Sequence, residues 1–377
     1  MSGFDAEKMT AYLDSLTEKG IPSVDCIVYQ DHKQIYRHMN GTSDAAKTKK
    51  VQADQRYLMF SMTKVQTMTA VMQLIEQGKL APDDEVGKYL PAYRELMVET
   101  EAGVVPAKES LRIWQLLSMQ SGLDYDLERP GILRVLKEKG SAATTRELVD
   151  AFAESPLKFE PGTHFLYSLS HDVAAAVIES VTGMRFGEYL KKNLWEPLGF
   201  TDTFFAKPFN DGLERLAQQF IVNEEGIVPM EQSCNYQLSE NYESGGAGLV
   251  SCTEDYAKLA DTLACGGESA EGVRILKPES VEKIKENLLC EAGLKDIEST
   301  MGRKGYGYGC GMQVLLHPEL LGSPAPAGIF GWDGAAGSCI QMDTASRRSF
   351  VYVQHVRNCG MSYDTIHPKL RDMVFGG

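Results

Sequence analysis

The sequence Phe60-Ser61-Met62-Thr63-Lys64 begins the helix-like segment that organises this chain of 377 residues. Beyond it, apolar residues recur every three to four positions as far as residue 75, which is the spacing of a helix with one buried stripe. Ser61 is therefore expected at the N-terminus of this helix. Lys64 follows about one turn further along the same face, so the two side chains are predicted to converge.

A serine hydroxyl beside a lysine amine indicates nucleophilic catalysis. Serine is a poor nucleophile until a base takes its proton, and a lysine whose pKa is lowered by burial can be that base. The free N–H groups at a helix N-terminus can in addition bind a developing oxyanion. The alternative is that Ser61 only caps the helix.

The same Ser-x-x-Lys spacing occurs twice more, at 155–158 and 280–283. The first copy runs into the turn Glu160-Pro161-Gly162, and the second lies in a charged helix that begins after Pro278. Both are interpreted as surface coincidences. Only the copy at 61–64 lies between an apolar run and a buried helix, which would hold the pair rigid and partly dry.

Composition excludes several classes of protein. Hydrophobic residues make up 43% of the chain and charged residues 24%, as in an ordinary globular protein with one large or two interleaved domains. The net charge of −14 argues against nucleic acid and anionic membranes as partners.

The N-terminal sequence has no apolar core of a signal peptide, and no segment approaches the length of a membrane span. The eight cysteines form no Cys-x-x-Cys pair and are expected to be reduced, buried thiols. The protein is accordingly predicted to be cytoplasmic. None of the seven histidines has a partner at metal-ligand spacing, and the glycine-rich loop at 244–248 lacks a nucleotide fingerprint. No metal or cofactor is expected.

Periodicity places strands at both ends of the chain. A helix over 5–20 precedes a strand hairpin formed by 24–29 and 34–39. The period changes to two at residue 305, where a glycine-rich strand is expected to run to 316, and three more strands follow before a closing helix at 364–375.

Between these ends the pattern is mostly helical. The predicted fold is therefore α+β, with a mainly antiparallel sheet flanked by helices and an additional all-helical subdomain. Residues 1–92 and 300–377 are predicted to form the sheet domain together, and 93–299 the helical subdomain, with the active site between them.

Two further polar clusters are candidates for the site. Tyr167 lies on a turn before a helix, where its phenol could enter a cleft and a nearby lysine would lower its pKa, although it could equally be half-buried packing. In Trp332-Asp333-Gly334-Ala335, glycine allows close approach, and the N–H of Ala335 could face that of Ser61 to form an oxyanion hole. The alternative there is an edge strand with a capping tryptophan.

These clusters, in this order, resemble the serine β-lactamase and penicillin-binding-protein-like superfamily. Within it they are most similar to the class C β-lactamase-related branch that includes family VIII carboxylesterases. Further similarity lies in Leu116-Leu117-Ser118-Met119-Gln120-Ser121-Gly122-Leu123 and Trp195-Glu196-Pro197-Leu198-Gly199-Phe200. The resemblance implies that Ser61 is the acylated nucleophile, Lys64 its base and Tyr167 the proton shuttle. It also implies an oxyanion hole from the backbone N–H groups of Ser61 and Ala335.

Two positions depart from the family pattern. The second motif is usually Tyr-x-Asn, but its third position here is Leu169, which removes a polar contact to a substrate amide. Penicillin-recognising relatives hold a carboxylate with Lys-Thr-Gly, whereas this chain has Trp332-Asp333-Gly334. Tryptophan supplies no cation, and Asp333 would repel an anion if it faced the cleft.

We therefore predict a serine hydrolase that cleaves carboxylic esters of small molecules through an acyl-enzyme at Ser61. Trp332, Asp333, Gly334 and Tyr125 are the candidate substrate-binding residues. Within the enzyme class, the alternative is amide hydrolysis by a β-lactamase or D-amino-acid peptidase. Outside it, the alternative is a non-catalytic relative that keeps the cleft for binding.

Overall fold

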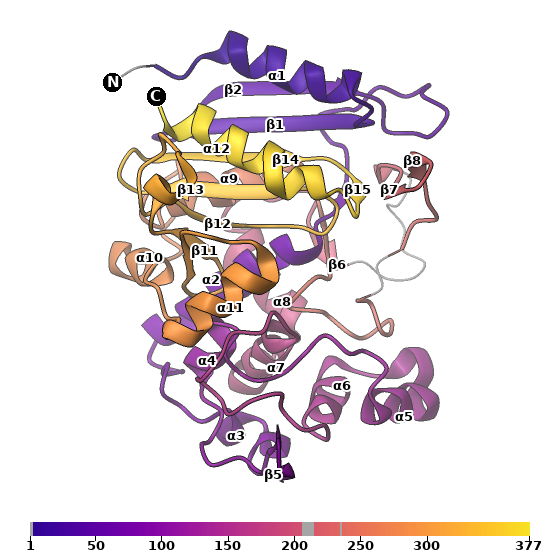
Figure 1. Cartoon of the computed structure of the whole chain (residues 1–377), viewed down its shortest axis with the longest axis vertical. Coiled ribbons are helices and arrows are strands. Elements are labelled where there is room, and N and C mark those ends of the chain that lie inside the picture. Colours follow the sequence, from indigo (N-terminus) through magenta and orange to yellow (C-terminus); the bar gives the residue numbers. More distant parts are fainter. Residues whose placement is uncertain (1–2, 206–214, 234–235) are drawn as a thin grey trace.

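The structure is a computed structural model that describes residues 3–205, 215–233 and 236–377. Cys234, one of the eight cysteines considered above, lies outside the described residues. The other seven are free thiols, but the expectation that all are buried is wrong, because Cys290 is exposed and Cys265 is half-buried. Figure 1 shows a sheet with its helices in the upper part of the molecule, a helical part below, and α2 (Thr63–Glu76) between the two.

A seven-stranded sheet combines the two ends of the chain. Its order is β10-β11-β12-β13-β14-β1-β2, and every neighbouring pair is antiparallel. The strands are β1 (Ser23–Gln30), β2 (Lys33–Gly41), β10 (Tyr306–Tyr308), β11 (Gln313–Leu315), β12 (Phe330–Asp333), β13 (Cys339–Asp343) and β14 (Arg348–Val353). The N-terminal hairpin joins the C-terminal strands through β1 and β14, which confirms the sheet predicted from the two termini.

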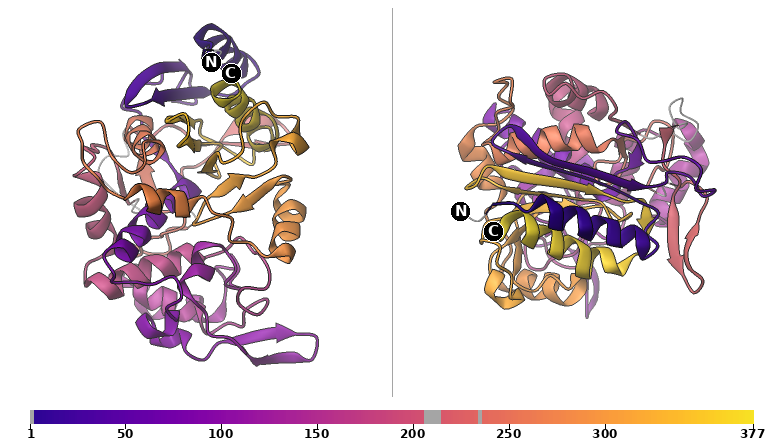
Figure 2. Two further views of the ribbon diagram at one scale, coloured as in Figure 1. Left: turned by 90° about the vertical axis from the view of Figure 1, so that its left-hand side faces the viewer. Right: turned by 90° about the horizontal axis from the view of Figure 1, so that it is seen from above.

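Helices cover both faces of this sheet because successive strand residues point to opposite sides. Val28 belongs to the apolar cluster under α1 (Ala6–Glu18) and α12 (His367–Phe375), whereas its neighbour Ile27 belongs to the cluster that includes α9 (Thr253–Ala264). Figure 2 shows α1 and α12 side by side on one face. The α+β class with a mainly antiparallel, helix-flanked sheet is confirmed.

The lower part contains α3 (Val86–Tyr89), α4 (Ile113–Leu117), α5 (Pro130–Lys139), α6 (Thr145–Phe152), α7 (Ser170–Thr182) and α8 (Phe186–Leu190). The remaining helices are α10 (Pro278–Ile284) and α11 (Glu291–Met301), and the short strands are β3 (Tyr57–Leu58), β4 (Met97–Thr100), β5 (Gly103–Pro106), β6 (Phe204–Phe205), β7 (Phe220–Asn223), β8 (Gly226–Pro229), β9 (Leu249–Ser251) and β15 (Val356–Arg357). The division into 1–92 plus 300–377 and 93–299 stays a prediction. Within the second range, α9 covers the sheet.

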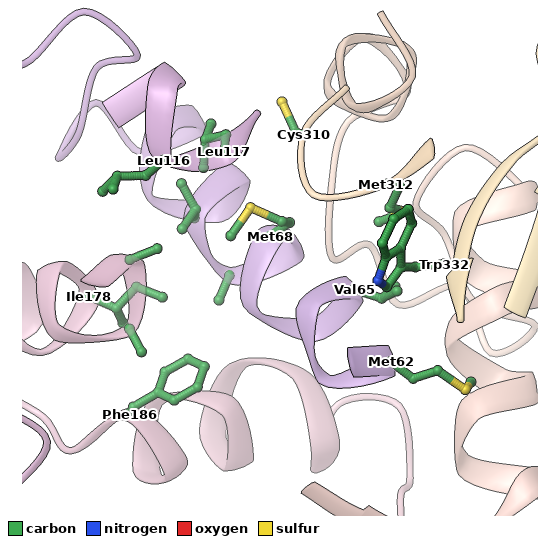
Figure 3. Close-up of a cluster of buried hydrophobic side chains, with 14 of the residues drawn as sticks. Met62, Val65, Met68, Leu116, Leu117, Ile178, Phe186, Cys310, Met312 and Trp332 are labelled. Atoms are coloured by element: carbon green, nitrogen blue, oxygen red, sulfur yellow. The ribbon is translucent and has the colours of Figure 1, made fainter. Parts of the chain in front are cut away.

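The helix α2 is more deeply buried than its sequence predicts. One apolar stripe was expected, but every residue from Thr63 to Leu74 is buried, because α2 lies between the sheet and helices α7 and α8. Figure 3 shows Val65 and Met68 of α2 among the apolar side chains of this core. Some of its buried polar groups bond to neighbouring segments: Thr67 Oγ1 donates to the carbonyl of Gly245 at 2.6 Å.

The expected strand over 305–316 is wrong. The chain forms the antiparallel pair β10 and β11 instead, and the connecting turn places Gly311 at a φ of +71° with Leu117 O accepting from its N–H. A Cβ on Gly311 would lie 2.0 Å from Cγ of Met68, so the glycine is there for close approach to α2. The alternation of glycine with other residues from 305 onward suggested a single strand, because the turn between β10 and β11 contains no polar residues that would indicate a turn.

None of the helices within the described residues is both long and apolar enough to cross a membrane.

Candidate active site

Ser61 lies at the junction of β3 and α2, in a single 3₁₀ turn formed by Phe60–Met62. The preceding residue, Phe60, is fully buried and has a φ of +47°, which is uncommon for a side chain of this size. Such backbone persists only where packing enforces it, and it is concentrated at functional sites. The expectation that Ser61 starts the helix is confirmed to within one turn.

Lys64 meets Ser61 inside the protein. Its Nζ lies 3.3 Å from Oγ of Ser61, 2.9 Å from the hydroxyl of Tyr125 and 2.7 Å from the carbonyl oxygen of Gly246. Burial disfavours the charged amine and lowers the pKa of Lys64 from 10.5 to about 7, although Asp172 and Asp333 oppose the shift. A substantial fraction of the amine is thus neutral near pH 7 and able to accept a proton.

A buried acid supports the loop that contacts the lysine. Oδ1 of Asp172 accepts from Tyr242 at 2.7 Å and from Ser244 at 2.6 Å, and the Ser244 hydroxyl in turn accepts from the Ala247 N–H at 3.0 Å. Burial raises the pKa of Asp172. Asp172 therefore holds the loop at 244–248, whose Gly246 carbonyl binds Lys64.

Tyr167 lies across the cleft with Trp332. The indole Nε1 donates to the Tyr167 hydroxyl at 3.0 Å, and Lys64 Nζ lies 4.6 Å from the centre of the Tyr167 ring. The expectation that the lysine lowers the pKa of this phenol is wrong. Burial raises the pKa of Tyr167, hydrogen bonds from Ser61 and Trp332 oppose this only in part, and the amine faces the ring rather than the hydroxyl. Tyr167 is therefore protonated at neutral pH.

These groups surround a cleft of about 510 Å³. Its lining includes Ser61, Tyr125, Tyr167, Trp332, Asp333 and Ala335. The predicted site residues thus meet in one place, although Lys64 and Gly334 do not line the cleft. Lys64 is fully buried and reaches the cleft only through its contact with Ser61. Gly334 is buried behind the lining, where a Cβ would lie 2.5 Å from the carbonyl oxygen of Met59, so its bare backbone lets β12 approach the nucleophile.

Leu169 does not point into this cleft. Its side chain is 4% exposed and belongs to the apolar core. The position that carries asparagine in the family motif is therefore filled by packing, as the departure in the sequence suggested.

Sequence reasoning missed several residues of the site. Tyr236 and Arg303 line the cleft, and Arg303 forms an ion pair with Asp333. Asp172 and Gly246 lie behind Lys64. No periodic pattern could mark them, because each comes from a loop or helix end distant in sequence from residue 61. Tyr125 was assigned only as a substrate wall, whereas its hydroxyl contacts the lysine.

A group of potential metal ligands outside the cleft was also missed. Atoms of His32, Asp261 and Cys265 lie within 4.8 Å of one another. They are engaged without a metal: Nδ1 of His32 is 2.8 Å from Asp261 Oδ2, and Nε2 of His32 is 3.2 Å from the Arg347 guanidinium. Asp261 also accepts from the N–H of His32 at 3.1 Å, so the carboxylate fastens the turn between β1 and β2 onto α9.

Comparison with known proteins matches this chain to a family. A family model described as Beta-lactamase matches residues 6–360. The chain belongs to the Beta-lactamase family. Esterase EstB of Burkholderia gladioli is 26% identical over 406 residues, covering 98% of this chain and 96% of EstB. A putative D-alanyl-D-alanine carboxypeptidase of Escherichia coli K12 is 26% identical over 370 residues, covering 88% of this chain and 79% of the relative.

Solved structures agree on the fold. EstCE1, a hydrolase with promiscuous acyltransferase activity, aligns with a TM-score of 0.81 at 24% identity over 99% of this chain and 98% of its own. Unliganded simvastatin synthase LovD from Aspergillus terreus aligns with a TM-score of 0.79 at 20% identity, over 98% of both chains. The family and its relatives identify this protein as an enzyme of the serine hydrolase type with the β-lactamase and transpeptidase-like fold.

Proposed function

We propose that this enzyme hydrolyses carboxylic esters of small molecules through an acyl-enzyme on Ser61. The observation that carries the proposal is the buried amine of Lys64, 3.3 Å from Oγ of Ser61 and with its pKa lowered to about 7. A general base is most effective when its pKa lies near the working pH. The similarity to esterase EstB supports ester cleavage in particular.

In the first step, the neutral amine of Lys64 takes the proton of the Ser61 hydroxyl, and Oγ forms a bond to the ester carbonyl carbon. The carbonyl of Gly246 can only accept hydrogen bonds, so it fixes one N–H of the amine and orients the nitrogen. Ser61 and Ala335 both line the cleft, and their backbone N–H groups are the donors for the oxyanion.

In the second step, the bond between the carbonyl carbon and the alcohol oxygen breaks. Tyr167, protonated and held by the indole of Trp332, gives its proton to the departing alkoxide. The tyrosine regains a proton from the ammonium of Lys64 through the Ser61 oxygen or water in the cleft. Water then attacks the acyl-enzyme with the same groups acting in reverse, which releases the acid and restores Ser61.

Amide hydrolysis is the second candidate, because one relative is named a putative D-alanyl-D-alanine carboxypeptidase. Two observations favour esters. Leu169 is buried in the core, so it offers no hydrogen bond to a substrate amide. Arg303, the single cation among the described residues that line the cleft, is bound to Asp333. A non-catalytic binding role would not require a lysine buried beside the serine. A cytoplasmic location and independence from metals and cofactors stay predictions.

The test is intact-protein mass spectrometry after brief exposure to p-nitrophenyl acetate, p-nitrophenyl butyrate and nitrocefin, with Ser61→Ala as the control. A Ser61-dependent acyl adduct or turnover with the two esters, and little with nitrocefin, is the expected result. Rapid turnover of nitrocefin would indicate a β-lactamase instead. Absence of any reaction in the wild-type protein would contradict the proposal and favour the binding role.

A further inference from the structure

The cleft contains a buried ion pair that the proposed mechanism does not use. Nη2 of Arg303 donates to Oδ2 of Asp333, and the two side chains are only 10% and 11% exposed. Asp333 is the last residue of β12, directly after Trp332. Arg303 follows Gly302, whose left-handed backbone ends α11 and turns the chain toward the cleft. Both residues line the cleft together with Ser61.

The pair engages Nη2 of Arg303 and neutralises the charge of the guanidinium. A substrate carboxylate at Arg303 would lie beside the carboxylate of Asp333, which the fold already holds in place, and breaking the buried pair to relieve that repulsion would leave an uncompensated charge behind. The nearby ring of His367, with Nδ1 4.0 Å from Asp333 Oδ2, does not supply a positive charge, because burial lowers the pKa of His367 and favours the neutral imidazole. Asp364 adds a further negative charge to the lining.

The rest of the wall suits uncharged groups. The ring centre of Tyr125 lies 5.5 Å from those of both Tyr167 and Tyr236, and the ring centre of Tyr167 lies 5.4 Å from that of Trp332. Met301 and Tyr363 extend this surface. Aromatic and thioether side chains bind apolar acyl and alkyl groups through buried area and dispersion, with no need for substrate charge.

We propose that Asp333 is a specificity-determining residue: its carboxylate occupies Arg303 and thereby excludes carboxylate-bearing substrates, which leaves uncharged esters as the substrate class. This inference rests on the proposed esterase function. This proposal differs from simple repulsion of anions by Asp333. It assigns the potential anion site to Arg303, so replacing Asp333 should allow Arg303 to bind a substrate carboxylate.

The experiment compares matched charged and uncharged esters. One pair places the charge on the alcohol, as 3-carboxyphenyl butyrate against 3-carbamoylphenyl butyrate. The other places it on the acyl group, as the p-nitrophenyl half-ester of adipic acid against the corresponding adipamide ester. The readout is the ratio of kcat/KM for the charged ester to that for its amide, which cancels changes that affect both substrates equally.

The wild-type protein should disfavour the charged member of each pair. Asp333→Asn keeps the shape of the side chain but frees the guanidinium, so the ratio should rise about tenfold or more in at least one pair, the effect of one charge-assisted hydrogen bond. The double variant Asp333→Asn with Arg303→Gln is the matched control, and its ratio should fall back most of the way toward that of the wild-type protein. An unchanged ratio in folded Asp333→Asn, or an equal rise in the double variant, overturns the proposal.

A second variant covers the case in which Asp333→Asn does not fold. Arg303→Gln leaves the carboxylate of Asp333 unpaired, so the preference should move toward cations. Acetylcholine should gain about tenfold over its uncharged isostere 3,3-dimethylbutyl acetate, through the Coulomb attraction between its ammonium and the carboxylate. An unchanged preference here would also count against the pair as the determinant of specificity.

Binding separates this proposal from the esterase function. In Ser61→Ala, which cannot be acylated at this position, calorimetry with the same esters measures affinity alone. A gain for the carboxylates on adding Asp333→Asn supports the specificity site even if the wild-type protein hydrolyses no ester. Ester turnover by the wild type with no such gain in either assay sustains the esterase function and refutes the role of Asp333.

Discussion

Replacement of Lys64 by methionine tests the physical basis of the site, because it removes the buried amine and keeps a side chain of similar length. Burial lowers the pKa of Lys64 from 10.5 to about 7. Between these values the unfolded chain holds a proton that the folded chain has released. The free energy of unfolding must therefore rise with pH in this window, by about 1.4 kcal/mol per pH unit and by about 5 kcal/mol over the whole shift.

The sign of this effect is fixed by the direction of the pKa shift. Burial of the charged amine destabilises the folded protein fully below about pH 7, and this cost declines as the pH rises and is absent above the unfolded pKa of 10.5. Below about pH 7 both states are protonated and the lysine adds no slope. The difference in unfolding free energy between wild type and Lys64→Met should consequently be flat at low pH and should change by about 1.4 kcal/mol per unit above neutrality.

The assay is urea-induced unfolding of both proteins at several pH values between about pH 6 and pH 9.5, analysed by linear extrapolation. Single-turnover acylation by p-nitrophenyl butyrate is measured in parallel. In the wild type, acylation should fall about tenfold per pH unit below the pKa of the base and level off above it. Lys64→Met should lose this reaction. Parallel stability curves for the two proteins would refute the lowered pKa, and a wild-type acylation rate independent of pH would refute Lys64 as the base.

Three other substitutions test the neighbours of the pair. Gly246→Ala would place a Cβ 2.6 Å from Asp172 Oδ2 and 3.4 Å from Lys64 Nζ. Acylation should therefore drop at least about tenfold, and the melting temperature should fall. The control is Gly293→Ala, in helix α11 with ordinary contacts, which should be neutral or stabilising by up to about 1 kcal/mol. Equal behaviour of the two alanine variants would argue against a crowded Gly246. Tyr125→Phe keeps the ring but removes the hydroxyl 2.9 Å from Lys64. Acylation should slow about tenfold, which corresponds to the free energy of one hydrogen bond. An unaltered rate would mean that Tyr125 only lines the substrate cleft. Tyr167→Phe should slow hydrolysis of ethyl butyrate far more than that of p-nitrophenyl butyrate, because only the poor leaving group needs a proton, and equal losses for both esters would exclude Tyr167 as the acid.

The sequence determined the parts of the site that depend on local spacing. Ser61 and Lys64 are three residues apart at the start of a helix, and the helical period alone makes such side chains converge. The strands at the two ends of the chain, and their union in one sheet, followed from the change of period along the sequence. Tyr167 and Trp332 were marked by their motifs and meet through a hydrogen bond.

Only the tertiary structure decided what surrounds these residues. The pKa of Lys64 depends on its complete burial, and that of Tyr167 rises because protein surrounds the phenol on the cleft wall. Neither environment follows from the apolar stripe of one helix or from the sequence of one turn. The pairing of Arg303 with Asp333 joins the end of α11 to the end of β12. Asp172 acts on the lysine through the loop at 244–248, which is distant in sequence from both residues. Electrostatic environment arises from groups that are distant in the chain and close in space, which is why local patterns located the catalytic pair but not the charges that control it.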